Sequence, residues 1–283
     1  MATAISIFSL AARPRGRSFF LPREHGAWGM LLVPLVAGAA AGNPRGERIV
    51  WILLFALASL GLFCLRTPVE AALGLSALRP QNDGERRLVH SFIFLYASAA
   101  LGALAVLIFV AHAYGLLLLG AAAAIAFLLQ AILKQLGRNT RMNSQLTGSI
   151  ALSSTAAAAY YLATGHFGRV AMMVWLLNWV FSADQIHFVQ LRIHSARAKT
   201  LSQKLRVGKG FLIHQVFALL FLVFMWKTGL VTGLILIAFS PLLARSLAWF
   251  LESRSTLKVQ RLGMTELLYA VVFGLFFIVG FRH

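Results

Sequence analysis

The chain has 283 residues, of which 59% are hydrophobic and 12% are charged, and its mean hydropathy is +0.79. A soluble domain carries about 25% charged residues, so this composition excludes a soluble globular protein. The formal net charge of +18 would suit nucleic acid. However, the sequence has no basic module interleaved with aromatic residues, so we expect no nucleic-acid partner. The single cysteine, Cys64, excludes an internal disulfide and a multi-cysteine metal site.

Long apolar stretches alternate with short polar segments along the whole chain. A helix needs about 20 apolar residues to cross the hydrocarbon core of a membrane, and nine stretches approach this length. The sequence therefore predicts an all-α polytopic membrane protein, with a basic arm at 1–24 and a single transmembrane helical domain at 25–283. The predicted spans are 26–42, 49–65, 91–111, 114–133, 145–164, 168–190, 210–227, 229–250 and 264–281.

Positive charge falls on alternate segments between these spans. The N-terminal arm and the second, fourth, sixth and eighth connections hold 21 of the Lys and Arg residues, and all other segments together hold 5. Positively charged loops stay on the cytoplasmic side of a membrane. We therefore expect the N-terminus inside, the C-terminus outside, and the polar chemistry at the cytoplasmic ends of the spans.

Four of the eight acidic residues fall at these predicted cytoplasmic ends: Glu24, Glu70, Asp184 and Glu266. Ionisable groups at membrane depth are costly, so they often mark functional sites. A simpler interpretation also exists, because acidic residues favour the first turn of a helix. On that interpretation Thr265 is the N-cap of the last span and Glu266 lies in its first turn.

The sixth predicted span carries the richest polar sequence of the chain. Asp184, His187 and His194 are spaced three and seven residues apart, so they project from one broad helical face, and Asn178 lies almost two turns deeper. Such a face points into a helical bundle, where it either binds a ligand or holds helices together through hydrogen bonds. His25 follows an acidic residue at the start of the first span, and a neighbouring carboxylate fixes the imidazole tautomer.

Basic residues stand near the same ends of the spans. Arg66 and Glu70 flank Pro68, which we expect to end or kink the second span. Lys134 and Arg138 close the fourth span, and Arg192 closes the sixth. Arginine binds phosphate bidentately, so these residues suit a phosphate or diphosphate headgroup. Anchoring by the positive-inside rule is the alternative explanation for each of them.

The run Pro22-Arg-Glu-His-Gly-Ala-Trp-Gly-Met-Leu-Leu-Val-Pro34 resembles the signature of the YwiC-like bacterial membrane proteins. The resemblance extends over most of the chain and includes the stretch from His187 to Arg192. It implies a multi-pass protein of the bacterial cytoplasmic (inner) membrane.

The number of spans, the cytoplasmic N-terminus and the polar ends of the second and sixth spans are similar to the UbiA superfamily of intramembrane prenyltransferases. Ile186-His187-Phe188 resembles a Pro-His-Phe-containing run in its haem O synthase branch. Two Asp-rich motifs of that superfamily bind Mg²⁺ and a prenyl diphosphate, and Mg²⁺ prefers oxygen ligands. The resemblance implies a UbiA-like bundle with Mg²⁺ at Glu70 and Asp184, although this chain keeps only one carboxylate at each motif.

Three classes of function remain open. The first is a transferase that acts on a prenyl or other lipid diphosphate in a cavity open to the cytoplasm, with His25, Asp184 and His187 as catalytic residues. The second is a non-catalytic protein that binds a lipid, quinone or haem, or assists assembly of a respiratory complex. The third is a transporter, although no convincing internal repeat is present. The substrate-binding residues of the first class would be Glu24, Arg66, Lys134, Arg138, Asn178, Arg192 and Glu266.

Overall fold

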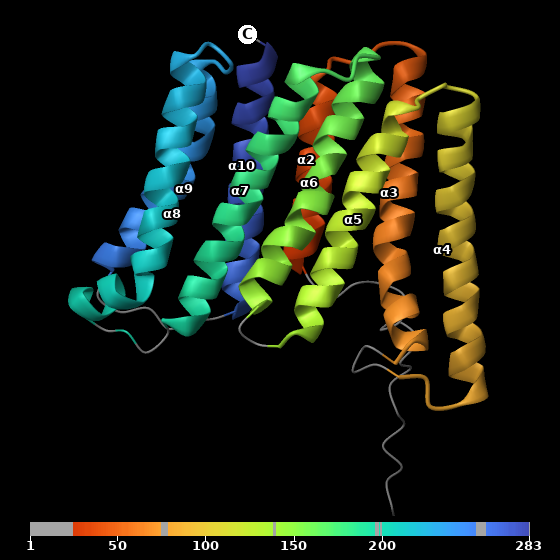
Figure 1. Ribbon diagram of the computed structural model, residues 1–283, viewed down its shortest axis with the longest axis horizontal. Coiled ribbons are helices and arrows are strands. Elements are labelled where there is room, and N and C mark those ends of the chain that lie inside the picture. The colour runs from red at the N-terminus through yellow and green to blue at the C-terminus, as the bar shows by residue number, and fades with distance from the viewer. Residues whose placement is uncertain are drawn as a thin grey trace, which may run out of the picture. The chain divides into compact units, whose positions relative to one another are not determined.

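A computed structural model describes residues 25–74, 79–137, 140–195, 198, 200–252 and 259–282. Within these ranges the protein consists of nine α-helices and contains no strand, so the predicted all-α fold class is confirmed (Figure 1). The helices are α2 (His25–Ala41), α3 (Glu47–Ala72), α4 (Asp83–Phe109), α5 (Gly115–Gln135), α6 (Arg141–Thr164), α7 (Arg169–His194), α8 (Leu201–Lys227), α9 (Gly233–Leu251) and α10 (Val259–Arg282).

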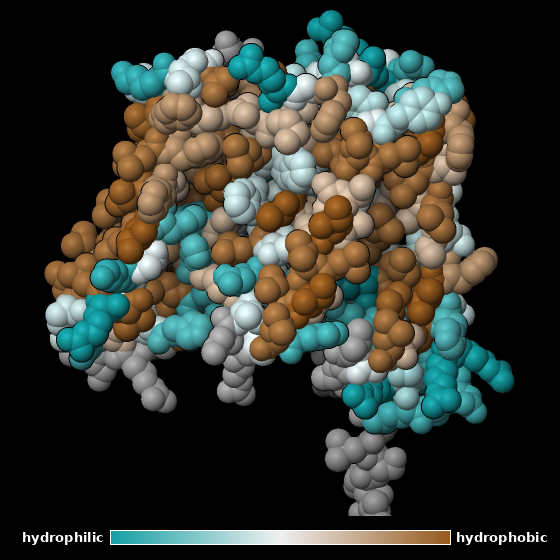
Figure 2. Space-filling view, in the orientation of Figure 1, coloured by the Kyte–Doolittle hydropathy of each residue, from teal (hydrophilic) through white to brown (hydrophobic). Residues whose placement is uncertain are grey.

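Six of the described helices are long and apolar enough to cross a membrane: α3, α4, α5, α8, α9 and α10. Their outward side chains are apolar, as at Leu118 on α5 and Phe217 on α8, which are 67% and 68% exposed. Figure 2 shows hydrophobic side chains along the helices and hydrophilic ones gathered at the helix ends. A surface this apolar is covered by lipid. The protein is therefore a multi-pass integral membrane protein.

The shorter helix α2 is apolar, whereas α6 and α7 carry too many polar residues to meet the same criterion. Most serine and threonine hydroxyl groups of α6 bond within their own helix, as in the 2.8 Å bond from Ser153 Oγ to the Ser149 carbonyl, whereas Ser144 donates to the Gln130 carbonyl of α5. This arrangement satisfies buried hydroxyls without water. Helix α6 packs against α2, α5 and α7 (Figure 1). Because protein surrounds α6 and not lipid, this helix can be polar and still lie at membrane depth.

The chain forms two compact units, whose boundaries fall inside α3 and α4. The described part of the first unit comprises residues 57–74 and 79–104. Its two helical segments pack closely at Gly61, where a Cβ would lie 3.1 Å from the Ala100 side chain. Toward the connection, Ala71 packs against Val89.

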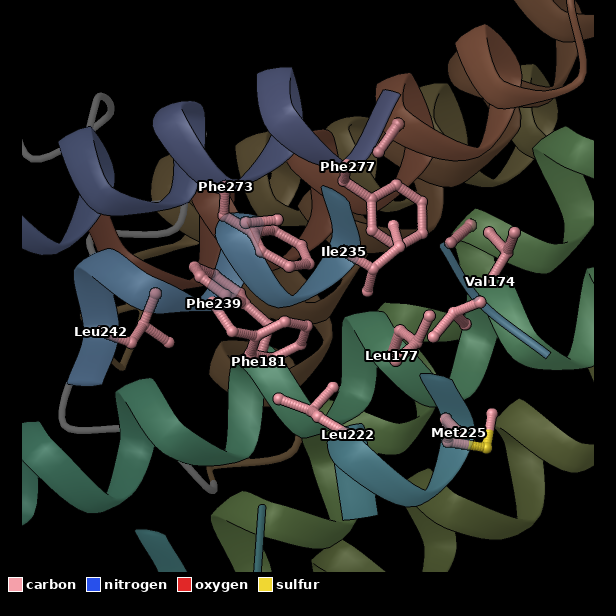
Figure 3. Packing of buried hydrophobic residues seen from close by; sticks show 14 of the residues in the cluster. Val174, Leu177, Phe181, Leu222, Met225, Ile235, Phe239, Leu242, Phe273 and Phe277 are labelled. Carbon is pink, nitrogen blue, oxygen red and sulfur yellow. The ribbon is translucent and has the colours of Figure 1, made fainter. Parts of the chain in front are cut away.

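The second unit comprises residues 24–56 and 105–283, and its largest core joins α7, α8, α9 and α10 (Figure 3). The rings of Phe181 on α7 and Phe273 on α10 stack with centroids 3.9 Å apart, and Phe239 on α9 meets Phe273 edge-on. Offset-stacked and edge-on rings are favourable arrangements of aromatic side chains. This core fixes the mutual positions of three helices that also carry buried charges.

Two local interpretations of helix ends are corrected by the structure. Helix α3 continues past Pro68 to Ala72, so the proline does not end it, whereas the predicted alternative of a kink at Pro68 stays a prediction. Helix α10 begins at Val259, which places Glu266 two turns inside the helix and makes Thr265 no N-cap. The hydroxyl of Thr265 instead donates to the carbonyl of Arg261, 2.8 Å away. Both errors came from applying local rules to segments that the helix simply runs through.

Candidate functional site

A buried cluster of charges joins α7, α9 and α10. Arg245 of α9 lies between two carboxylates: its Nη2 is 2.5 Å from Asp184 Oδ2 on α7, and its Nη1 donates to Glu266 Oε2 on α10. Asp184, Arg245 and Glu266 are 3%, 7% and 5% exposed. Removing one partner of such a buried ion pair leaves an uncompensated charge, so the cluster holds the three helices in one arrangement.

Two glutamines and two aromatic rings complete the surroundings of this cluster. Gln215 on α8 donates to Asp184 Oδ1, and Gln185 donates to the backbone carbonyl of Glu266 at 2.7 Å. The guanidinium of Arg245 lies 4.0 Å from the centre of the Phe188 ring and 5.2 Å from that of Tyr269. Cation–π contacts of this kind stabilise a desolvated arginine.

A cavity of about 390 Å³ opens between the beginning of α6, the end of α7 and the first half of α8. These are helix ends that the charge pattern assigns to the cytoplasm. Its volume falls within the range of small-molecule sites, about 300–1,000 Å³. None of its lining residues in the described part of the chain is acidic. They are Arg141, Met142, His187, Gln190, Leu191, His194, Val207, Gly210 and Phe211.

The polar groups of the cavity are held mainly by α7. His194 Nδ1 lies 2.7 Å from the carbonyl of Gln190, and because a carbonyl only accepts, Nδ1 is the donor in this hydrogen bond. The side chain of Gln190 donates to Gln145 Oε1 at 2.7 Å, which joins α7 to α6. His187 Nδ1 is buried and has no hydrogen-bond partner among the described residues.

A second imidazole stands against His187. The rings of His187 and His214 lie edge to face, with centroids 4.3 Å apart and an interplanar angle of 79°. His214 precedes Gln215, whose side chain donates to Asp184. The neighbouring residues 214 and 215 of α8 therefore contact the cavity histidine and the charge cluster respectively.

The predicted residues of α7 divide between these two places. His187 and His194 line the cavity together, whereas Asp184 belongs to the charge cluster. Asn178 is 0% exposed and its Nδ2 donates to the Val174 carbonyl at 2.8 Å. Arg192 forms an ion pair of 3.5 Å with Glu252 at the end of α9.

The remaining predicted site residues lie elsewhere. Arg66 and Glu70 form an ion pair of 2.9 Å one helical turn apart, in the first compact unit. Lys134 is exposed in the last turn of α5. Glu24 and Arg138 lie outside the described residues, and His25 is described only as the first residue of α2. Their proposed roles in binding or catalysis stay predictions.

The predicted Mg²⁺ site also stays a prediction. Both carboxylate oxygens of Asp184 already accept hydrogen bonds, from Gln215 and Arg245, so in this arrangement the residue fits an ion pair better than a metal ligand. Among the described residues, no group of three or more His, Cys, Asp or Glu side chains could hold a metal ion. Glu70 and Asp184 belong to different compact units.

Sequence reasoning missed three residues of this region. Arg245 was counted at the edge of the eighth connection, whereas it lies inside α9. Lys204 was counted in the sixth connection, yet it is 5% exposed and its Nζ donates to the Trp249 carbonyl at 2.6 Å. Gln215 was not considered. One signal was available: an arginine and a glutamine inside apolar helices need buried partners, and Asp184 and Glu266 were the acidic candidates.

A comparison with known protein families finds one match. Residues 21–160 match the family model of YwiC-like proteins. Over this segment the chain is similar to the YwiC-like proteins. The match covers α2 to α5 and most of α6, including the sequence Pro22–Pro34 that first suggested the family. No curated protein and no solved structure matches the chain.

The YwiC-like match includes Arg141 but ends before the other polar residues of the cavity and before the charge cluster. The expected extension of the resemblance to the stretch from His187 to Arg192 therefore stays a prediction. The likeness to the UbiA superfamily stays a prediction in the same way.

Proposed function

We propose that this YwiC-like membrane protein binds an amphiphilic anion, of the prenyl or lipid diphosphate class, in the cavity of α6, α7 and α8. The observation that carries the proposal is the lining of the cavity. Arg141, His187 and His194 supply positive or proton-donating groups, while Leu191, Val207 and Phe211 supply an apolar wall. The carboxylates of α7 and α10 are engaged with Arg245 instead of facing a ligand.

The chemistry of the lining favours a phosphate over a neutral headgroup. Arginine offers a planar fork of donors that matches phosphate oxygens, and such charge-assisted bonds are about twice as strong as neutral ones. An isoprenoid or acyl chain would continue along the apolar side chains that the helices present to lipid. A site that contacts both the charged headgroup and the apolar chain of a ligand is expected at the ends of membrane helices.

Transfer of the prenyl group is the second candidate, and the buried Nδ1 of His187 favours it. The allylic C–O bond of the bound diphosphate would break, and diphosphate would leave with the electron pair. An acceptor hydroxyl or carbon would attack the allylic carbon and lose its proton to His187. Mg²⁺, which the UbiA resemblance implies, would when bound neutralise the charge of the leaving group.

The thermal stability of the purified full-length protein tests ligand binding. A ligand at a hundred times its dissociation constant adds about 2.7 kcal/mol to the free energy of unfolding. We expect geranylgeranyl diphosphate to raise the melting temperature, and geranylgeraniol and inorganic diphosphate to raise it less, because each lacks one half of the interaction. If geranylgeraniol raised the melting temperature as much as geranylgeranyl diphosphate does, recognition of the headgroup would be contradicted.

Variants locate the effect and separate binding from transfer. Arg141→Gln and His187→Gln should remove the shift, and Lys209→Gln should keep it, because Lys209 is exposed beside the cavity and does not line it. If the ligand bound at some other surface, all three variants would show the same rise in melting temperature as the wild type. Release of diphosphate that requires both Mg²⁺ and an acceptor would support transfer, whereas a shift without release would support a binding protein.

A further inference from the structure

The wall that α8 gives to the cavity contains a glycine. Val207, Gly210 and Phe211 line the cavity, and the ring of His214 contacts that of the cavity residue His187. The four positions of α8 follow the spacing i, i+3, i+4 and i+7, so they share one face of the helix. Gly210 therefore stands beside two apolar side chains on the face that α8 turns toward the cavity.

A second glycine of the same helix has a packing role. A Cβ at Gly208 would lie 2.8 Å from Cζ of Phe250 on α9, so the close approach of these two helices requires a glycine there. One turn earlier, Nζ of Lys204 donates to the carbonyl of Trp249 at 2.6 Å. Phe211 belongs to the same apolar cluster as Trp249 and Phe250. These contacts hold the α8 wall of the cavity in place against α9.

Packing between helices does not require a glycine at position 210. A Cβ built on Gly210 has no atom within 4 Å in the described part of the chain. Glycine is less stable than alanine inside a helix, and a methyl group would fit here without a clash. Because Gly210 lines the cavity, the missing side chain leaves a recess in the apolar wall, beside Val207 and Phe211.

We propose that Gly210 is a specificity-determining residue, whose recess accepts a methyl branch of the ligand's apolar chain and so selects a branched chain over an unbranched one. The inference rests on the proposed function, since it requires an amphiphilic anion in the cavity. A headgroup bound at Arg141 leaves the adjoining chain against Val207 and Phe211, where the recess lies.

The expected size of the effect follows from the fit of one methyl group. A methyl or methylene group more or less in an apolar pocket changes recognition by about 10–200-fold. Since one recess meets one branch, we expect a preference of about tenfold, at the lower end of this range. The Gly210→Val substitution would fill the recess and remove the preference.

Two saturated diphosphates test the recess, because they differ in their methyl branches alone. Phytanyl diphosphate and hexadecyl diphosphate have the same main chain, and the first of them carries methyl branches. Their dissociation constants follow from the rise in melting temperature of the purified full-length protein with ligand concentration. We expect the wild type to bind phytanyl diphosphate about tenfold more tightly than hexadecyl diphosphate. Gly210→Val should bind the two with equal affinity.

Gly120→Val provides the control, because Gly120 on α5 also has no atom within 4 Å of a Cβ in the described part of the chain and does not line the cavity. This variant should keep the preference of the wild type. Gly210→Ala is the milder variant, should the valine variant fail to fold. It should be at least as thermally stable as the wild type and show a reduced preference.

Two results would overturn the recess and leave the proposed function standing. The first is a wild type that binds both diphosphates with equal affinity. The second is an undiminished preference for phytanyl diphosphate in Gly210→Val and Gly210→Ala. A wild type that binds neither diphosphate would overturn the proposed function together with this inference.

Discussion

Arg245 and Asp184 are 61 residues apart in sequence and form a buried ion pair with a 2.5 Å contact between Nη2 and Oδ2. The pair lies one helical turn from Phe181 and Leu242, which belong to the large apolar core of the second unit. The apolar core and the charged cluster therefore position the same helices at successive depths. The shape of the cavity at the end of α7 therefore depends on how the apolar core and the charged cluster hold these helices together.

Replacing Arg245 with methionine should strongly destabilise the protein. The substitution removes the positive partner of two buried carboxyl groups, and breaking a buried pair costs about 3–5 kcal/mol. Thermal unfolding in detergent measures the effect. Arg206→Met is the matched control, because Arg206 is exposed on α8. An Arg245→Met protein as stable as this control would contradict the structural role of the cluster.

Phe273→Ala should loosen the contact between α7 and α10. Phe273 is 0% exposed and its ring stacks on Phe181, and truncating a buried phenylalanine costs about 3–5 kcal/mol. Leu275→Ala, on the same helix at a position 61% exposed, should change the unfolding temperature little. If both variants unfold at the same temperature, the stacked core is not a main source of stability.

Gly38→Ala should separate α2 from α6. A Cβ at position 38 would lie 2.0 Å from the backbone oxygen of Ala156, which cannot move aside as a flexible side chain could. We expect a loss of about 1–3 kcal/mol from this overpacking. Gly120→Ala adds the same methyl group where nothing lies within 4 Å, so it should leave stability unchanged or slightly raised. A neutral Gly38→Ala would show that α2 and α6 are not in close contact.

The helices were predictable because each follows from its own apolar run. The predicted connection around His112 lies between α4 and α5, where His112 adopts a positive φ of 52°. Most predicted spans left out the polar turns at the ends of the helices, such as residues 201–209 of α8. Apolar length alone does not show how far a helix continues beyond the membrane. A helix that emerges into water keeps its backbone bonds, so its polar turns belong to the same element.

The pairing of Asp184 with Arg245 and Glu266 was not predictable in the same way. The sequence identified both acids as residues at membrane depth, but Arg245 lies six residues from the end of α9 and resembles the anchoring arginines of the loops. Which helices become neighbours is decided by packing over long distances in sequence. The joint lining of the cavity by His187 and His194 follows from their seven-residue spacing on α7, whereas the participation of Arg141 depends on how α6 packs against α7.

The central claim, that the cavity holds an amphiphilic anion, is tested most directly by photolabelling. A photoactivatable analogue of geranylgeranyl diphosphate, bound to the full-length protein and mapped by mass spectrometry, should label the start of α6 and the 207–211 segment of α8. Unlabelled geranylgeranyl diphosphate should prevent this labelling, and Arg141→Gln should reduce it. Labelling confined to other helices, or unaffected by the competitor, would contradict the account.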